Sequence, residues 1–414
     1  MTPAPKHIVC RTDFPVLAQN KLAYLDNAAT TQMPTTVLDA VSAYYQEGAA
    51  NPGRGEYALN LQVTQLYEQA RQRLAAFVGA HPEELAFTPG ATEGLNTVAQ
   101  AWATKVLGPD DEVIVSAAEH HSNFLVWQRV CDQAGARLVI APLNEEGRLD
   151  KTCFESLLSA KTKIVALAHV SNVLGTIFPI KELAALAHEH GAAFVLDCAQ
   201  SIGHLPLDLH ELDVDFASFS GHKMYALTGI GALYVKESLI HEMSAFMLGG
   251  GMVDEVWERR SSYLNDIRKL EAGTPNVPGA ISMAAAADYL EGIGLATIQQ
   301  HERELTGCLF GLLSETPDCK VYGIPNNAAD RTGIISFNIR GVHPTDVALA
   351  LDEAGVCIRT GTHCAQPLHR RLGIEQSCRI SLGLYNTVED IQTAAAVLSN
   401  LRQKLGRRIL GMFP

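Results

Sequence analysis

The sequence has no long apolar segment. Its 414 residues contain no unbroken run near the roughly 20 apolar residues that a membrane-spanning helix needs. The first residues, MTPAPKHIVCRTDFP, also lack the apolar stretch followed by small residues that marks a secretory signal. We therefore expect a protein without a membrane partner, and the cytoplasm as its location.

An excess of positive charge is also missing. The formal net charge is −13, whereas nucleic-acid binding draws most of its affinity from Lys and Arg side chains that neutralise phosphates. One basic stretch, RQKLGRR near the C-terminus, is more typical of a solvated helix end, because cations in a last turn complement the helix dipole. We expect no nucleic-acid partner.

Paired cysteines are absent as well. Nine cysteines are scattered along the chain, with no CxxC pair among them. This pattern excludes a disulfide framework and a zinc site, so we expect no metal and mostly reduced, buried and inert thiols. With 47% hydrophobic and 19% charged residues, the chain has the composition of a globular protein with a large core.

What the sequence does contain, between about residues 85 and 235, is an alternation of apolar β-rich runs and amphipathic helical segments. The runs are ELAFT, EVIVS, RLVIAPL, KIVALAHV, AAFVLD, DFASFS and GALYV. Between two of them, KELAALAHEH has apolar residues at helical spacing, and Gly191 offers a C-cap. Repetition of such units predicts an α/β fold with a mainly parallel sheet between helices.

The pattern changes after about residue 285. The segments ISMAAAADYLEGIG, RTGIISFNI, PTDVALALDEAG, VCIRT and CRISLGL, with a last helix from about Thr387, predict a smaller α+β domain. We expect an N-terminal segment (residues 1–22) packing on the small domain, a large domain (23–285) and the small C-terminal domain (286–414). The sequence shows no long linker, so the two domains should be closely apposed.

Polar residues follow several predicted strands, where α/β folds collect ligands. Lys223 comes just after DFASFS, although a lysine there can simply be solvated. Asp197 ends AAFVLD and can cap a helix or, beside a catalytic lysine, keep a pyridinium nitrogen protonated in an electron-sink cofactor. In LAFTPGATEGLN, the helix start at Gly90 and Thr92 can hold a phosphate, although many such starts bind nothing. The histidine pair in SAAEHHSNF lacks further ligands at metal-binding spacing.

One cysteine stands in an unusual setting. Cys364 lies in RTGTHCAQP, residues 359 to 367, where glycine and proline disfavour helix and strand. A packing cysteine suits an apolar periodic element better. The neighbouring Arg359 and His363 can favour the reactive thiolate, or they can be ordinary loop residues beside a half-buried structural cysteine.

Together these stretches resemble the cysteine desulfurases, pyridoxal-phosphate (PLP) enzymes of the class V aminotransferase group with the fold type I architecture. The chain is similar to the branch whose cysteine lies in an Arg-x-Gly-x-His-Cys-Ala segment. The matching stretches span about residues 24 to 386 in the expected order: YLDNAATTQ, FTPGATEGLNTVA, EHHSNFLVWQ, VSNVLGT, LDCAQS, FSGHKMYALTGIG, EAGTPN, RTGTHCAQP and RISLGLYNT.

The resemblance implies a role for each candidate residue. Lys223 would form the Schiff base with PLP in the large domain and later move protons. The other cofactor contacts would come from Asp197 at the pyridine nitrogen, Gln200 at the phenolic oxygen, His120 stacked on the ring, and Thr92, Ser220 and His222 at the phosphate, joined by Thr274 of a second subunit in a homodimer. Asn172 and Arg379, with Arg359 nearby, would bind the substrate carboxylate.

The same resemblance explains the cysteine in the loop. Cys364 would take sulfur from L-cysteine as a persulfide, leave alanine, and pass the sulfur to an acceptor protein, for example for iron–sulfur cluster assembly. A nucleophile that reaches the cofactor and then an acceptor belongs on a movable segment.

Some positions depart from the family pattern, and other reactions stay open. The departures, which affect the expected pocket and loop shape, are Gly53, Tyr57, Ala226, Leu227 and Thr362. The alternatives are a selenocysteine lyase acting on L-selenocysteine, another class V reaction such as transamination or epimerisation, and a non-catalytic sulfur-relay scaffold.

Overall fold

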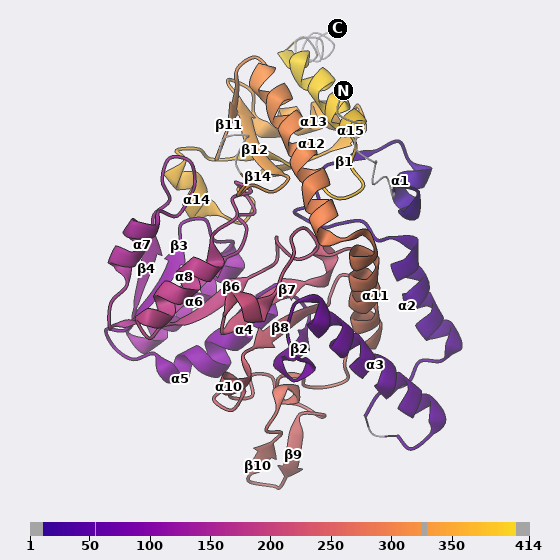
Figure 1. Ribbon diagram of the computed structural model, residues 1–414, viewed down its shortest axis with the longest axis vertical. Coiled ribbons are helices and arrows are strands. Elements are labelled where there is room, and N and C mark those ends of the chain that lie inside the picture. The colour runs from indigo at the N-terminus through magenta and orange to yellow at the C-terminus, as the bar shows by residue number, and fades with distance from the viewer. Residues whose placement is uncertain (1–10, 54, 324–328, 403–414) are drawn as a thin grey trace.

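The structure is a computed structural model that describes residues 11–53, 55–323 and 329–402. A seven-stranded sheet forms the base of its larger part, and a four-stranded sheet forms the C-terminal part above it (Figure 1). Within the described residues, no helix combines the length and the apolar character needed to span a membrane.

The large sheet uses the strands that the sequence predicts. Across the sheet they are β2 (Leu85–Thr88), β8 (Gly231–Val235), β7 (Phe216–Ser220), β6 (Ala193–Asp197), β5 (Thr162–Ala168), β3 (Glu112–Ser116) and β4 (Arg137–Ala141). The strands from β7 to β4 pair in parallel, whereas β8 runs antiparallel to β7 and β2. The predicted α/β class with a mainly parallel sheet is confirmed.

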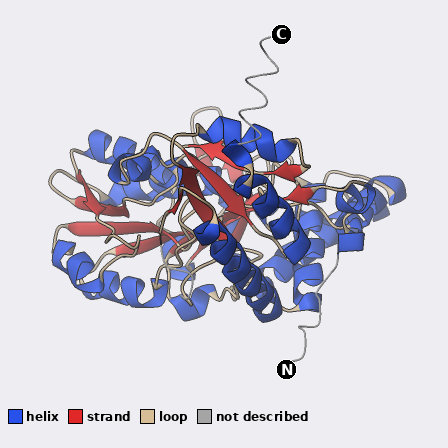
Figure 2. Ribbon diagram, turned by 90° about the horizontal axis from the view of Figure 1, so that it is seen from above, coloured by secondary structure: helices blue, strands red, loops and turns tan. Residues whose placement is uncertain are grey.

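Helices cover both faces of this sheet (Figure 2). Along β5, Val165 and Leu167 pack into the core on one face, and Ile164 and Ala166 pack on the other. The first face carries α3 (Ala58–Phe77), α7 (Lys151–Leu157), α8 (Ile180–Glu189) and α11 (Val277–Ile293), with α2 (Thr35–Glu47) against α11; the second carries α4 (Ala91–Val98), α6 (Leu125–Ala134) and α10 (Glu237–Ile240). Gly191 follows α8 with φ 74°, as expected of a C-cap glycine.

The C-terminal part is a second, antiparallel sheet. Its order is β11 (Cys319–Val321), β12 (Ile334–Ile339), β15 (Ser377–Ser381) and β14 (Arg359–Gly361). Its core also includes apolar side chains of α12 (Leu295–Glu315), α13 (Pro344–Asp352) and α15 (Val388–Ser399). The smaller α+β unit therefore has the elements that the sequence predicts, including the last helix, which Thr387 caps.

The N-terminal residues bind to this upper part. Residues 1–10 lie outside the described residues, and the rest of the predicted N-terminal segment holds the short helix α1 (Pro15–Gln19). Arg11 forms an ion pair with Asp390 of α15 (3.3 Å). The next strand, β1 (Ala23–Tyr24), pairs in parallel with β13 (Val356–Cys357). The predicted domain boundaries stay a prediction.

Several short elements complete the chain. They are α5 (Thr104–Val106), α9 (Leu209–Leu212), α14 (Gln366–Arg371) and the hairpin of β9 (Val253–Val256) and β10 (Ser261–Tyr263). The hairpin projects from the base of the molecule, far from the small sheet (Figure 1). Apart from Arg402, the basic stretch RQKLGRR lies outside the described residues.

Candidate active site

A cavity of about 370 Å³ lies at the carboxyl ends of the parallel strands. This is where the topology of an open α/β sheet places ligands. Its walls hold every predicted site residue except Thr274, namely Thr92, His120, Asn172, Asp197, Gln200, Ser220, His222, Lys223, Arg359, Cys364 and Arg379. The fold therefore gathers side chains that lie far apart in the sequence.

Lys223 ends a short turn, Gly221–Lys223, directly after β7. The backbone N–H and the hydroxyl of Thr31 both donate to the carbonyl of His222 (2.9 and 3.1 Å), which fixes this turn. Among the described residues, the Lys223 amine has no hydrogen-bond partner. Burial lowers its pKa to about 8, although Asp197 opposes the shift. About a tenth of the amine is therefore neutral and nucleophilic at pH 7, far more than for a lysine in water.

Asp197 and Gln200 lie at the end of the neighbouring strand β6. Asp197 is buried, its Oδ1 accepts a hydrogen bond from the Ala199 N–H (2.9 Å), and burial raises its pKa. Gln200 donates to the carbonyl of Ala28 (2.9 Å). Because β6 and β7 are adjacent and parallel, the carboxylate and the Lys223 amine face the same cavity.

The start of α4 forms the third wall. Ser220 Oγ accepts a hydrogen bond from the Ala91 N–H (2.9 Å), and Thr92 lies in the first turn, whose amides lack helical acceptors. This contact requires a close approach of two chain segments, since a Cβ on Gly231 would lie 2.6 Å from the Gly90 Cα. Backbone amides and hydroxyls thus meet at a helix N-terminus, the arrangement that binds anions.

Two histidines on these walls are neutral. His120 Nδ1 accepts a hydrogen bond from the Ser122 N–H (3.1 Å), so its proton is on Nε2. Burial, with Lys223 nearby, lowers the pKa of His120 to about 3 and that of His222 to about 4. Ser122 also lies within hydrogen-bond distance of Thr92 (Oγ to Oγ1, 2.8 Å).

A buried acid that the sequence analysis does not single out lies next to His120. Glu119 binds the hydroxyl of Ser116 (2.5 Å) and the side-chain amide of Asn123 (2.7 Å). Burial raises its pKa to about 7. Glu119 therefore ties the end of β3 to the turn that carries His120; its place after the strand EVIVS was the available signal.

The segment around Cys364 differs from the prediction. Residues 359 to 367 do not lie entirely outside helix and strand: Arg359–Gly361 form β14, and Gln366 begins α14. The two elements leave a turn of four residues, 362 to 365, in which His363 and Cys364 have φ of 50° and 55°. Two successive side-chain-bearing residues in the left-handed region cost about 1–2 kcal/mol each, so neighbouring contacts must hold the turn.

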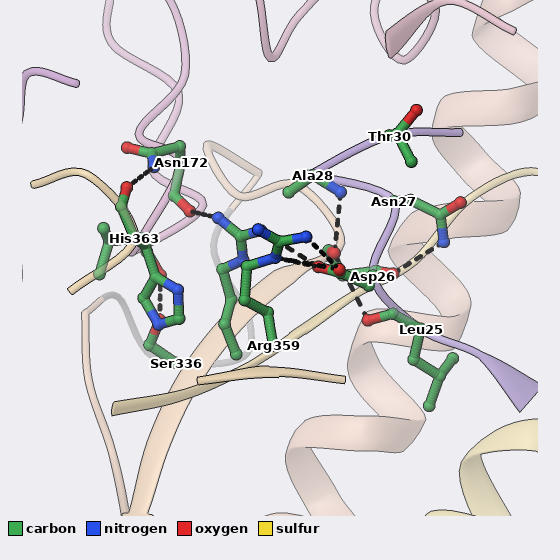
Figure 3. Close-up of polar contacts among 12 residues, drawn as sticks. Leu25, Asp26, Asn27, Ala28, Thr30, Asn172, Ser336, Arg359 and His363 are labelled. Atoms are coloured by element: carbon green, nitrogen blue, oxygen red, sulfur yellow. Dashed lines mark hydrogen bonds and ion pairs between the residues drawn. The ribbon is translucent and has the colours of Figure 1, made fainter. Parts of the chain in front are cut away.

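Those contacts come from two other loops. The His121 N–H donates to the Cys364 carbonyl (2.7 Å), and the Asn172 side-chain amide donates to the His363 carbonyl (2.7 Å; Figure 3). The Gln366 N–H donates to the His121 ring (3.3 Å). The thiol residue itself stays exposed at the cavity wall.

His363 does not act as a cation beside Cys364, contrary to one expectation from the sequence. Its ring lies against Ser377 (Nε2 to Oγ, 3.1 Å), and burial with Arg379 nearby lowers its pKa to about 2. Of the two cations expected near Cys364, Arg359 and His363, only Arg359 remains; its side chain is half-exposed in β14.

The other described cysteines meet the expectation of buried thiols only in part, because Cys153, Cys308, Cys319 and Cys357 are half-buried. All eight cysteines in the described ranges are free, and Cys131, Cys198 and Cys378 are buried. Burial raises the pKa of these three thiols, to about 11 for Cys131.

Asp26 is a second residue that the sequence analysis did not single out, although it lies in the quoted stretch YLDNAATTQ. Its carboxylate accepts hydrogen bonds from Arg359 (Nε to Oδ2, 3.0 Å; Figure 3) and from Arg379 (Nη2 to Oδ1, 3.3 Å). Arg379 also donates through Nη1 to the Asn172 carbonyl (2.9 Å). The two arginines expected to bind a substrate carboxylate therefore meet at a carboxylate of the protein.

The remaining residues named from the sequence lie outside the cavity walls. Thr274 is exposed in the loop before α11, away from its own chain's cavity. None of the five positions that depart from the family pattern, Gly53, Tyr57, Ala226, Leu227 and Thr362, is a wall residue.

Comparison with known proteins identifies the family. Residues 23–393 match the family Aminotransferase class-V. A probable cysteine desulfurase of Halalkalibacterium halodurans is 44% identical over 398 residues, and one of Halobacterium salinarum is 42% identical over 399; the alignments cover 95% of this chain and 97% and 96% of those proteins. The apo structure of a cysteine desulfurase from Thermococcus onnurineus NA1 superposes with a TM-score of 0.91 at 37% identity, covering 94% of this chain and 96% of that one. As the motifs predict, the chain belongs to the aminotransferase class-V family and, within it, to the cysteine desulfurases.

Proposed function

We propose that the protein is a PLP-dependent cysteine desulfurase that converts L-cysteine to L-alanine and holds the released sulfur on Cys364. The observation that carries the proposal is a single cavity lined by the Lys223 amine, the Asp197 carboxylate and the Cys364 thiol. Family membership gives this combination its chemical context.

The cavity has the groups that PLP requires. Lys223 is an amine without a hydrogen-bond partner among the described residues, and Asp197 is a buried carboxylate suited to a protonated ring nitrogen. The amides and hydroxyls at Ala91, Thr92 and Ser220 suit the phosphate. When bound, PLP supplies an aldehyde that condenses with amines and a ring that stabilises negative charge at the α-carbon of an amino acid.

The protein's own residues prepare the substrate. Lys223, with a pKa of about 8, can take the α-proton as the neutral amine and return it as the ammonium ion. His120 is neutral and packs on the cofactor ring in this proposal. Arg379, Arg359 and Asn172 bind the α-carboxylate, which places the substrate sulfur toward Cys364.

Cys364 then completes the reaction. Its sulfur attacks the sulfur of the substrate, the substrate carbon–sulfur bond breaks, and the electron pair of that bond stays with the carbon fragment, which takes up a proton. L-cysteine and one thiol thus give L-alanine and one persulfide. The exposure of Cys364 leaves the persulfide open to an acceptor protein.

We include a homodimer in the proposal. Thr274 is exposed, and its loop contacts a segment that displays apolar side chains: the Gly273 N–H donates to the Gly250 carbonyl (2.7 Å), and Met247 and Leu248 are 52% and 67% exposed. A second copy of the chain bound at this surface would bury these side chains. Thr274 of each chain would then lie at the cavity of the other chain. A reducing cytoplasm, the expected location, suits the free thiols of the eight cysteines in the described part of the chain.

A direct test is incubation with L-cysteine followed by mass analysis of the peptide that contains Cys364. We expect added mass of one sulfur atom on this peptide and release of alanine. Cys364→Ser should show neither the added mass nor alanine from L-cysteine. Unmodified peptide with continued alanine release would contradict the proposal.

A further inference from the structure

The carboxylate of Asp26 stands between two guanidinium groups at one end of the cavity. The Arg359 Nε donates to both carboxylate oxygens (3.2 and 3.0 Å), and its Nη2 lies 3.0 Å from Oδ2 (Figure 3). Arg379 Nη2 donates to Oδ1 (3.3 Å). Asp26 and Arg379 are buried, whereas the side chain of Arg359 is half-exposed. Both arginines, but not Asp26, line the cavity.

Asp26 is held firmly in this position. Its backbone bridges Ser381 of β15, and its carbonyl accepts a hydrogen bond from the Ala29 N–H (3.1 Å). On the next residue, the Asn27 side chain donates to the Ser381 carbonyl (2.8 Å). These contacts fix the carboxylate where the chain leaves β1 and enters the cavity wall at Ala28.

Arg379 keeps a free hydrogen-bonding edge in this arrangement. Its Nη1 and Nη2 each have one protein acceptor, while its buried Nε has no partner among the described residues. Arg379 thus lines the cavity with hydrogen-bonding capacity that Asp26 does not use.

The charges at this end decide which ligand fits. Two guanidinium groups and one protein carboxylate together have a net charge of +1, which a single ligand carboxylate neutralises. A second ligand carboxylate would face an excess of negative charge in a partly desolvated site. Without Asp26, the two guanidinium groups would keep a second positive charge that could balance it.

We infer that Asp26 is a positioning and specificity residue: it orients Arg359 and Arg379, and it limits the cavity to amino acids that carry one carboxylate. The inference rests on the proposed function, since it takes an amino acid as the ligand. Asp26 acts through the two arginines and touches no reacting atom.

The test compares a monocarboxylate and a dicarboxylate amino acid. L-alanine and L-aspartate are titrated into the PLP-loaded protein, and dissociation constants are read from the change in cofactor absorbance. In Asp26→Asn, we expect the ratio of the L-aspartate to the L-alanine dissociation constant to fall by about tenfold relative to the unchanged protein. The KM for L-cysteine should rise severalfold with a smaller change in kcat, because carboxylate binding loses its orientation.

The chain offers a matched control. Asp318 also binds two arginines, Arg340 and Arg402, but lies outside the cavity walls. Asp318→Asn should leave the ratio unchanged, and Asp26→Glu, which keeps the charge, should preserve most of the discrimination. Thermal unfolding of each variant separates loss of fold from loss of selectivity.

An unchanged ratio in folded Asp26→Asn would overturn the inference, and so would an equal shift in Asp318→Asn. Failure of the proposed function looks different: the unchanged protein would then show no absorbance change with any amino acid. If Asp26→Asn does not fold, Asp26→Glu provides the test. A fall of about tenfold in the ratio of the two dissociation constants in Asp26→Glu, which keeps the charge, would contradict the inference.

Discussion

Lys223 shows how one residue acquires its chemistry from its surroundings. Lysine amines in water are protonated at neutral pH, with an ordinary pKa of about 10.4. Here burial lowers the pKa to about 8, and the Asp197 carboxylate limits the shift. His120 and His222, with pKa values of about 3 and about 4, stay neutral at physiological pH. Lys223 is therefore the group among these three that titrates near neutrality.

This difference predicts the pH dependence of cofactor capture. The neutral amine is the nucleophile, and it predominates above the pKa, so the rate at which cofactor-free protein takes up PLP should rise through about pH 8 and then level off. Absorbance after rapid mixing measures this rate between pH 6 and pH 9.5, values chosen to bracket the pKa of about 8.

The Asp197→Asn variant tests the cause. Because the Asp197 carboxylate raises the pKa of Lys223, its loss should move the midpoint to lower pH. Lys223→Ala should show no capture step at all. A midpoint near the ordinary lysine pKa would show that burial does not control this amine.

Cys364 supports a second prediction, which separates two substrates. Cys364→Ser should reduce turnover of L-cysteine to background, because no thiolate remains to accept sulfur. L-selenocysteine should keep a measurable fraction of its rate, since a selenol is far more acidic than a thiol and leaves more easily. The rate of alanine release measures turnover of each substrate. An equal loss of rate on both substrates would contradict this prediction, because it would show that Cys364 is needed as much for L-selenocysteine as for L-cysteine.

At the residue scale, the sequence predicted side chains whose roles follow from a strand end or a motif. Lys223, Asp197 and Thr92 follow buried strands, so topology alone brings them together. Asp26 was missed because its partners, Arg359 and Arg379, lie far along the chain. Glu119 binds nearby residues, Ser116 and Asn123, but its raised pKa comes mainly from burial, which its local sequence does not show. The direction of the His363 ring also depends on packing that no local pattern reveals.

At the scale of elements, the strand ends of the large sheet position the anion-binding turn, the name we give to Gly90, Ala91 and Thr92, where we propose that the phosphate binds. Gly231 begins β8 between the ends of β2 and β7. A Cβ there would collide with the Phe219 carbonyl oxygen and would lie 2.6 Å from the Gly90 Cα. The spacing between two backbones therefore requires glycine.

Gly231→Ala should destabilise the protein by about 1–3 kcal/mol, the usual cost of overpacking, and should weaken PLP binding by moving Gly90 away from Ser220. Denaturant unfolding and an absorbance titration with PLP measure the two effects. Gly311→Ala is the control: Gly311 is exposed within α12 with no atom near a built Cβ, so alanine should add about 0.5–1 kcal/mol. Similar unfolding curves for both variants would refute the argument from close approach.

The spacing of apolar residues predicted well those strands and helices whose side chains are buried on one face or on both faces. The strands of the large sheet are continuous apolar runs, and α8 and α15 have clear amphipathic spacing and end signals. The segment Arg359–Gly361 was missed as a strand because it is a short, polar edge strand whose pairing with β15 comes from the rest of the small sheet. Its glycine is tolerated at that edge, where the chain turns toward Cys364.

At the scale of the whole molecule, the loop of Thr274 lies at the surface and is anchored to the core through Glu271. Glu271, three residues before Thr274, accepts hydrogen bonds from Arg71 (2.6 and 2.9 Å), from the Tyr67 hydroxyl (2.9 Å) and from the Phe87 N–H (2.6 Å). The carboxylate thus fastens the loop to β2, the strand that leads into the chain's own anion-binding turn. Thr274 is presented outward from a fixed base.

Mixed dimers test whether that outward residue serves the other chain. In a dimer with one Lys223→Ala chain, the single complete site lies on the chain that keeps Lys223. If Thr274 acts across the interface, Thr274→Ala should weaken PLP binding at this site when it is placed in the Lys223→Ala chain. It should have no effect there when it is placed in the chain that keeps Lys223.

The measurement is the affinity of each mixed dimer for PLP, with differently tagged chains purified in pairs. Loss in the opposite arrangement would mean that Thr274 acts within its own chain, and equal loss in both would mean that it only supports the interface. Action of Thr274 within its own chain disagrees with its position outside the walls of that chain's cavity. To contact the phosphate there, Thr274 would need a rearrangement of its loop, which four hydrogen bonds to Glu271 hold in place. A clear effect across the interface would therefore make two chains the smallest unit with a complete phosphate site.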